Sequence, residues 1–195
     1  MSRPIARTAL AGVALAVGAL FALPSAAEEV SSEAATVAAT IAAPVGTRVA
    51  HIGYVVPNVR KAMEKAAADL GIDPANARYS KVSVDHARYF GKDTSFSAEY
   101  AMITVGGAQL EFIAPIAGQS PYADALFDAR HKDGTAHHVA FTVASIDARL
   151  AEMRKNHPRM LVVLDAAMPG GQRFVYLENV LPHLMVELIE GGAAR

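Results

Sequence analysis

Two stretches of the chain share one pattern of apolar and polar positions. Residues 136–150, AHHVAFTVASIDARL, start as an apolar run typical of a strand and continue into residues with helical spacing. Residues 51–63, HIGYVVPNVRKAM, follow the same plan, and a gapless superposition places His138 on His51. We interpret the two stretches as copies of one strand-turn-helix unit, so the sequence predicts a duplicated half-domain.

Each copy is followed by further strand patterns. For the first module we expect a strand over 49–56, a helix over 59–70, and further strands over 81–84, 96–105 and 108–114. For the second module we expect a strand over 136–143, a helix over 146–156, and further strands over 160–164, 173–178 and 184–190. A short helix over about 120–130 connects the modules. The predicted fold class is α+β, with two βαβββ modules whose sheets close on each other.

The start of the chain has the layout of a targeting segment. Arg3 and Arg7 precede the apolar run 9–23, and small residues follow at 25–27. This arrangement predicts a secretory signal peptide over 1–27, and therefore an exported protein that is periplasmic or secreted. An uncleaved membrane anchor is the alternative.

The remaining boundaries follow from composition. Residues 28–47 are rich in Ala, Ser, Thr and Val without aromatic residues, which indicates a flexible N-terminal tail. The expected domain covers 48–192, with a module over 48–118, a connecting helix within 119–133 and a second module over 134–192. Whether the modules pair within one chain or between two chains of a homodimer stays open.

Charge and cysteine content exclude several classes of partner and of metal ligand. The formal net charge is −1, so a nucleic-acid partner or, after signal cleavage, a membrane partner is not expected. The chain contains no cysteine, which excludes disulfides and thiolate metal ligands. We expect a small-molecule substrate.

A glutamate interrupts the apolar run of the last strand in each module. These residues, Glu111 and Glu187, occupy matching positions, as do His51 and His138. A buried carboxylate is costly unless it is paired or binds a cation. We therefore predict a divalent metal site with two histidines and two carboxylates, suited to Zn, Ni, Co, Mn or Fe. The alternative is two core histidines, with both glutamates paired to surface arginines.

Strand alternation separates the neighbouring histidines. His137 precedes His138 and, in a regular strand, would point to the opposite face. We therefore expect it to pack or to support the site from behind.

Three motifs carry a resemblance to a known family. They are LEFIAPI at 110–116, AHHVAFTVASIDA at 136–148 and PGGQRFVYLE at 169–178. The chain from about 49 to 190 resembles the vicinal oxygen chelate superfamily, which includes glyoxalase I, methylmalonyl-CoA epimerase, extradiol dioxygenases and antibiotic-resistance proteins. The resemblance implies paired βαβββ modules around a metal, with ligands at His51, Glu111, His138 and Glu187. Epimerases usually carry glutamine at the position of Glu111, so this residue is closer to the glyoxalase I pattern.

The resemblance also implies a chemistry. It suggests a metal-dependent lyase or isomerase that acts through a metal-stabilised enediolate of a small oxygen-chelating substrate. The catalytic base would be Glu187 or Glu111 in a glyoxalase-like enzyme and Glu99 in an epimerase-like one. Further candidates for substrate binding are Gly170, Gly171, Arg173 and Tyr176. A non-catalytic small-molecule binding protein and an Fe(II) dioxygenase are the alternatives.

Overall fold

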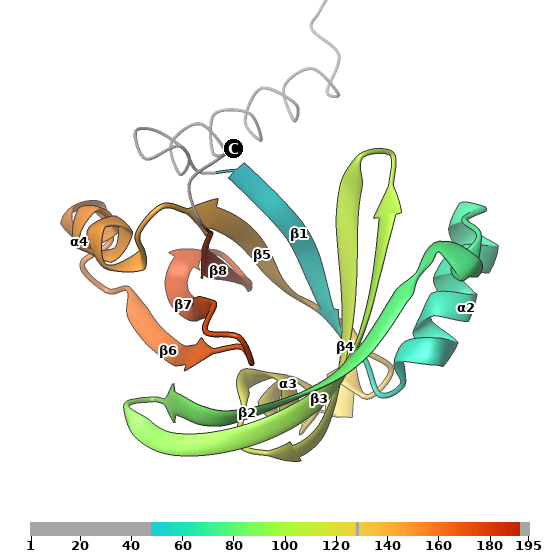
Figure 1. Cartoon of the computed structure of the whole chain (residues 1–195), viewed down its shortest axis with the longest axis horizontal. Coiled ribbons are helices and arrows are strands. Elements are labelled where there is room, and N and C mark those ends of the chain that lie inside the picture. The colour runs from blue at the N-terminus through green and yellow to red at the C-terminus, as the bar shows by residue number, and fades with distance from the viewer. Residues whose placement is uncertain (1–47, 128, 192–195) are drawn as a thin grey trace, which may run out of the picture. The chain divides into compact units, whose positions relative to one another are not determined.

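The computed structural model describes residues 48–127 and 129–191. The predicted signal peptide and tail, 1–47, lie outside the described residues. The described elements, shown in Figure 1, are β1 (Arg48–Val55), α2 (Val59–Leu70), η1 (Pro74–Asn76), β2 (Arg78–Tyr89), β3 (Lys92–Val105), β4 (Ala108–Gly118), α3 (Pro121–Phe127), η2 (Ala129–His131), β5 (Thr135–Val143), α4 (Ile146–Asn156), β6 (Leu161–Ala167), β7 (Arg173–Leu181) and β8 (Leu184–Glu190). No helix in these ranges is long and apolar enough to span a membrane.

The two long helices begin in the same way. Asn58 caps α2 by accepting a hydrogen bond from the backbone N–H of Lys61 at 2.9 Å. Ser145, at the matching position, caps α4 and accepts from the backbone N–H of Ala148 at 3.3 Å. Such caps satisfy N–H groups that have no partner within a helix. The predicted helix starts are confirmed.

The second strand is much longer than predicted. β2 extends over twelve residues rather than over 81–84, and a two-residue turn of Phe90 and Gly91 joins it to β3. Both turn residues have positive φ, 47° and 75°. Most of β2 is exposed, so its sequence lacks the apolar alternation that marks a strand. The prediction was therefore wrong in extent.

The strands form one closed barrel in the order β1-β4-β3-β2-β6-β7-β8-β5. Strand β1 is parallel to β4, and its counterpart β5 is parallel to β8. The modules join where β1 pairs with β5 and where β2 pairs with β6, both antiparallel. Figure 1 shows β1 and β5 side by side. The predicted α+β fold of two βαβββ modules is confirmed, and both modules belong to one chain.

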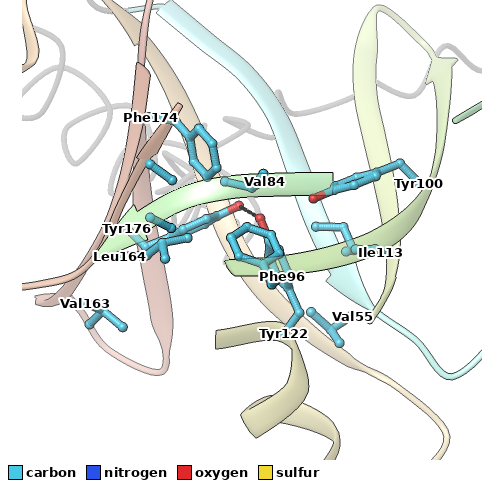
Figure 2. Packing of buried hydrophobic residues seen from close by; sticks show 13 residues of the cluster. Val55, Val84, Phe96, Tyr100, Ile113, Tyr122, Val163, Leu164, Phe174 and Tyr176 are labelled. Atoms are coloured by element: carbon cyan, nitrogen blue, oxygen red, sulfur yellow. Dashed lines mark hydrogen bonds between the residues drawn. The ribbon is translucent and has the colours of Figure 1, made fainter. Parts of the chain in front are cut away.

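Helices pack against different strands of the barrel. α2 packs on β3 and β4, and α4 packs on β8. α3, from the connection between the modules, sends Tyr122 into the barrel interior, where its side chain is 2% exposed. Figure 2 shows Tyr122 among buried residues of both modules. Burying a large apolar side chain stabilises a fold by roughly 1.5–3 kcal/mol, so α3 is anchored from inside.

Candidate metal centre

The candidate site is built on four neighbouring strands, with β1 and β5 in the middle and β4 and β8 outside. Ala140 of β5 pairs with His51 of β1 on one side and with Glu187 of β8 on the other. The methyl group of Ala140 fills little space between its larger neighbours. The imidazole and the carboxylate can therefore approach each other above it.

The same strands form an equivalent second row. Gly53 of β1 pairs with His138 of β5 on one side and with Glu111 of β4 on the other. A Cβ atom at Gly53 would overlap the ring of His138, so glycine is needed here for steric reasons. The two rows lie two residues apart along β1, and such residues share one face of a sheet. Both rows therefore face the barrel interior.

The four side chains converge. His51 Nε2 lies 3.1 Å from His138 Nε2, 3.0 Å from Glu187 Oε2 and 3.2 Å from Glu111 Oε2. His138 Nε2 lies 3.3 Å from Glu187 Oε2 and 3.5 Å from Glu111 Oε2. Ligand atoms about 2.1 Å from one ion are roughly 3.0–3.4 Å from each other. The separations among His51, His138 and Glu187 fit three atoms that share one cation, whereas Glu111 lies close to both imidazoles but outside the group of mutually close ligand atoms.

Glu187 gives a second indication of a cation. Its Oε2 atom is buried and accepts no hydrogen bond of ordinary geometry, although two imidazole nitrogens lie within 3.3 Å. The atoms are close without being aligned as donor and acceptor. Such an arrangement is expected when polar atoms point at a common ion. Together, His51, His138 and Glu187 offer ligand atoms that all lie within 4.8 Å of one another.

Electrostatics also favour positive charge between these groups. Burial would lower the pKa of His51, but the adjacent carboxylates of Glu111 and Glu187 outweigh burial and raise it to about 10. Burial would raise the pKa of Glu187, but His138 and His51 outweigh it and lower the value to about 2. The glutamates therefore stay ionised in the interior. A divalent cation offers such carboxylates a stronger partner than a proton on imidazole.

A β-bulge changes the position of His137. The β1–β5 pairing passes from Gly53↔His138 to Tyr54↔Ala136 and omits His137. The extra residue interrupts strand alternation. As a result, His137 Nδ1 lies 2.9 Å from His138 Nδ1, and the prediction that the rings point to opposite faces was wrong. Burial and the nearby His138 lower the pKa of His137 to about 3, so His137 is a neutral support for His138.

A cavity of about 270 Å³ lies beside the cluster. His51, Glu111 and Glu187 line it. Three tyrosines also line it: Tyr100, Tyr122 and the predicted Tyr176. Tyr176 Oη lies 3.5 Å from His138 Nε2 and 3.0 Å from Tyr122 Oη.

Sequence reasoning missed two of these tyrosines. Tyr100 is buried on β3 and follows the buried Phe96 and Ala98 at alternate positions, so strand alternation could have identified it. Tyr122 comes from the connecting helix α3, and no local pattern marks it as part of a site.

Glu99 is not brought to the cluster. It is exposed on β3, next to the inward-facing Tyr100. Because neighbouring residues of a strand point to opposite faces, Glu99 lies on the outside of the barrel. The structure therefore offers it no contact with the four converging side chains.

The proposed substrate loop is only partly at the site. Gly170 and Gly171 form the turn before β7 with φ of 105° and 89°. Arg173 lies beside a different cavity, together with Gly171, and its guanidinium is 2.9 Å from both Asp165 and Asp147. Instead of these residues, Met168 and Gln172 of the same loop line the 270 Å³ cavity.

The chain matches a protein family over most of the barrel. The family described as the Glyoxalase/Bleomycin resistance protein/Dioxygenase superfamily matches residues 50–176. The search of curated proteins found no significant match.

Solved structures are similar to this chain at low sequence identity. A hypothetical protein from Bacillus halodurans C-125 is 17% identical with a TM-score of 0.52, and the match covers 76% of this chain and 97% of that one. Methylmalonyl-CoA epimerase from Mycobacterium tuberculosis is 19% identical with a TM-score of 0.48, covering 74% and 87%. A Streptomyces coelicolor methylmalonyl-CoA epimerase variant in complex with 2-nitronate-propionyl-CoA is 24% identical with a TM-score of 0.48, covering 77% and 100%.

Gly53→Ala should weaken metal binding, because the added methyl group displaces the ring of His138. We expect a loss of about tenfold or more in affinity, measured by competition with a chelator. Gly107→Ala is the control for a methyl group added at a glycine away from the site, since nothing lies within 4 Å of it; its φ of 88° strains the backbone of the variant without touching His138. Unchanged affinity in Gly53→Ala would contradict this role for glycine.

His138→Ala should reduce metal affinity much more than His137→Ala. The first substitution removes a nitrogen of the cluster, and the second removes only the hydrogen-bonding partner of His138. For His137→Ala we expect about a 10–100-fold loss, which is typical of residues that orient a ligand. The same chelator competition measures both variants, and equal losses would show that His138 has no special place in the site.

Proposed function

Because the chain belongs to the glyoxalase/bleomycin resistance protein/dioxygenase superfamily, we propose that it is a metal-dependent lyase or isomerase of the glyoxalase-like kind. Its reaction would transfer a proton at a carbon atom of a small substrate that carries two neighbouring oxygens. The observation that carries the proposal is the convergence of two imidazoles and two carboxylates beside a cavity.

The cation would be held by His51, His138 and Glu187, whose ligand atoms are mutually close. Imidazole and carboxylate ligands suit Zn, Ni, Co, Mn or Fe(II). A bound divalent cation would supply positive charge that stabilises the negative charge developing on the substrate oxygens as the proton leaves.

Proton transfer is assigned to Glu111. Its Oε2 atom is 3.2 and 3.5 Å from the two imidazoles, and the corresponding distances of Glu187 are shorter, 3.0 and 3.3 Å. Glu111 is thus the less closely held carboxylate, and it lines the cavity. Burial alone would raise the pKa of Glu111, but the hydrogen bonds of His138 and His51 lower it, so the carboxylate stays ionised and is in the form that can accept a proton. Glu187 is the alternative base.

A second candidate is an Fe(II) dioxygenase. Two histidines and one carboxylate, as in the set His51, His138 and Glu187, are the ligands that non-haem Fe(II) oxygenases use. Glu111, within 3.5 Å of both imidazoles, has no part in that arrangement, which favours the proton-transfer reaction. Consumption of O₂ by the Fe(II)-loaded protein with a catechol would support the dioxygenase instead. A protein that binds metal and ligand without turning over either substrate would be a binding protein.

Metal-loaded protein should catalyse exchange of a carbon-bound proton with D₂O. Hydroxyacetone and 2-hydroxyacetophenone are suitable probes, because each is uncharged and carries two neighbouring oxygens beside exchangeable C–H bonds; proton NMR follows the exchange. Glu111→Gln should keep the metal and lose exchange by at least about 100-fold. Glu99→Gln, on the outside of the barrel, is the matched control.

Two outcomes would contradict these assignments. If the wild-type protein binds metal but exchanges neither probe, the lyase or isomerase function fails. If Glu111→Gln retains full exchange, the base is not Glu111, and Glu187→Gln becomes the decisive variant.

We also propose that the protein is exported to the periplasm or secreted. The basic residues, apolar run and small residues within 1–27 support this proposal. The exported protein should begin at Glu28 when the N-terminus of material from the periplasmic fraction or the medium is sequenced. Cell-associated protein that begins at Met1 would contradict it.

A further inference from the structure

The cavity beside the cluster has an unusual balance of charge. Among its lining residues that the structure describes, none is lysine or arginine. The charged carboxylates are Glu111 and Glu187, and the other lining residues include uncharged ones such as Met102, Met168 and Phe174. A negative group on a ligand, away from the cation, would meet no cationic side chain there and would lose its hydration.

The cavity is also small. Its volume of about 270 Å³ is just below the range typical of sites for drug-sized ligands, about 300–1,000 Å³. A ring with two attached oxygens fits a space of this order. A long conjugated carrier would have to extend out of the cavity.

One tyrosine hydroxyl in the cavity makes no hydrogen bond of ordinary geometry with the described residues. Tyr122 and Tyr176 satisfy each other through their hydroxyls at 3.0 Å. Tyr100, whose side chain is 6% exposed, has a buried hydroxyl that makes no hydrogen bond of ordinary geometry with a described residue. The hydroxyl of Tyr122 lies close enough to act on the pKa of Tyr100, but it is already paired with Tyr176. Figure 2 shows this hydroxyl directed from β3 into the barrel interior. A buried donor without a partner is unfavourable, so a ligand oxygen is a fitting acceptor.

The two modules differ at this position. Tyr100 pairs with Ile113, two residues after Glu111, and Phe174 pairs with Ile189, two residues after Glu187. Phe174 is therefore the counterpart of Tyr100 and lines the same cavity. One side of the cavity offers a hydroxyl donor where the other offers only an apolar ring.

We infer that the site selects a small substrate with no negative charge beyond its two neighbouring oxygens, and that Tyr100 donates a hydrogen bond to one of these oxygens. This inference rests on the proposed function, because the two oxygens are those that the cation would bind. It adds the class of substrate and a substrate-binding residue on the first module. The same charge balance disfavours a substrate that would have to place a further carboxylate inside this cavity, away from the cation.

Binding of two hydroxamates tests the substrate class. Benzohydroxamate presents two neighbouring oxygens on an uncharged ring, and 4-carboxybenzohydroxamate adds a carboxylate at the far end. With Zn-loaded protein, titration calorimetry should show that the carboxylated probe binds at least about tenfold more weakly, because it must desolvate its charge without a cationic partner. Equal or tighter binding of the carboxylated probe would overturn the inferred substrate class.

Tyr100→Phe tests the hydroxyl. The variant should retain its Zn and bind benzohydroxamate about tenfold more weakly, the loss expected for one hydrogen bond to a charged oxygen. Tyr54→Phe is the matched control, because Tyr54 lies on β1 but packs against the hydrophobic residues under α2, outside the barrel. Unchanged affinity in Tyr100→Phe would overturn the role of Tyr100.

The Zn content, measured first, separates this inference from the proposed function. Protein that takes up no Zn would overturn both. Protein that binds Zn and benzohydroxamate but exchanges no substrate proton would overturn the lyase or isomerase function, while the comparison of the two hydroxamates still decides the substrate class.

Discussion

The antiparallel pairing of β1 with β5 is the constraint on which the site depends. Its register places a small residue opposite each histidine, Ala140 opposite His51 and Gly53 opposite His138. Each small residue also has a glutamate on its other side. Because side chains alternate along a strand, a shift of one residue would turn a histidine to the outer face and disperse the cluster. The interface between the modules is therefore also what assembles the candidate metal centre.

Burying four ionisable groups opposes folding, so the surroundings of the cluster must hold it in place. The barrel is closed, so each described strand has a neighbour on both sides, although β2 pairs with β6 only through residues 87–89. The aromatic residues next to the cluster, including Tyr122 and Tyr176, pack edge-to-face and fill the interior. A bound cation would add stability by binding only the folded arrangement. Stability and metal binding are thus coupled through the same residues.

The repeat made much of this predictable. His51 and His138 occupy matching positions, as do Glu111 and Glu187. A pseudo-twofold arrangement of the two modules therefore predicts that the four residues converge, and in the structure they lie close together. Features that break local regularity were not predictable. β2 is mostly exposed and carries no apolar alternation, and the bulge at His137 depends on pairing with a strand far away in sequence. Tyr122 enters from a connecting helix, whose docking no local pattern encodes.

The differences between the modules then become informative. A symmetric set of ligands cannot distinguish the two oxygens of a substrate, yet proton transfer requires one defined orientation. The symmetry is broken where Tyr176 pairs with Glu187 but Met102 pairs with Glu111. It is broken again at the next equivalent pair, where the first module carries the tyrosine, Tyr100, and the second carries Phe174. One glutamate therefore lies beside a tyrosine and the other beside a thioether, and in the proposed reaction such unequal surroundings would allow one carboxylate to hold the cation while the other moves the proton.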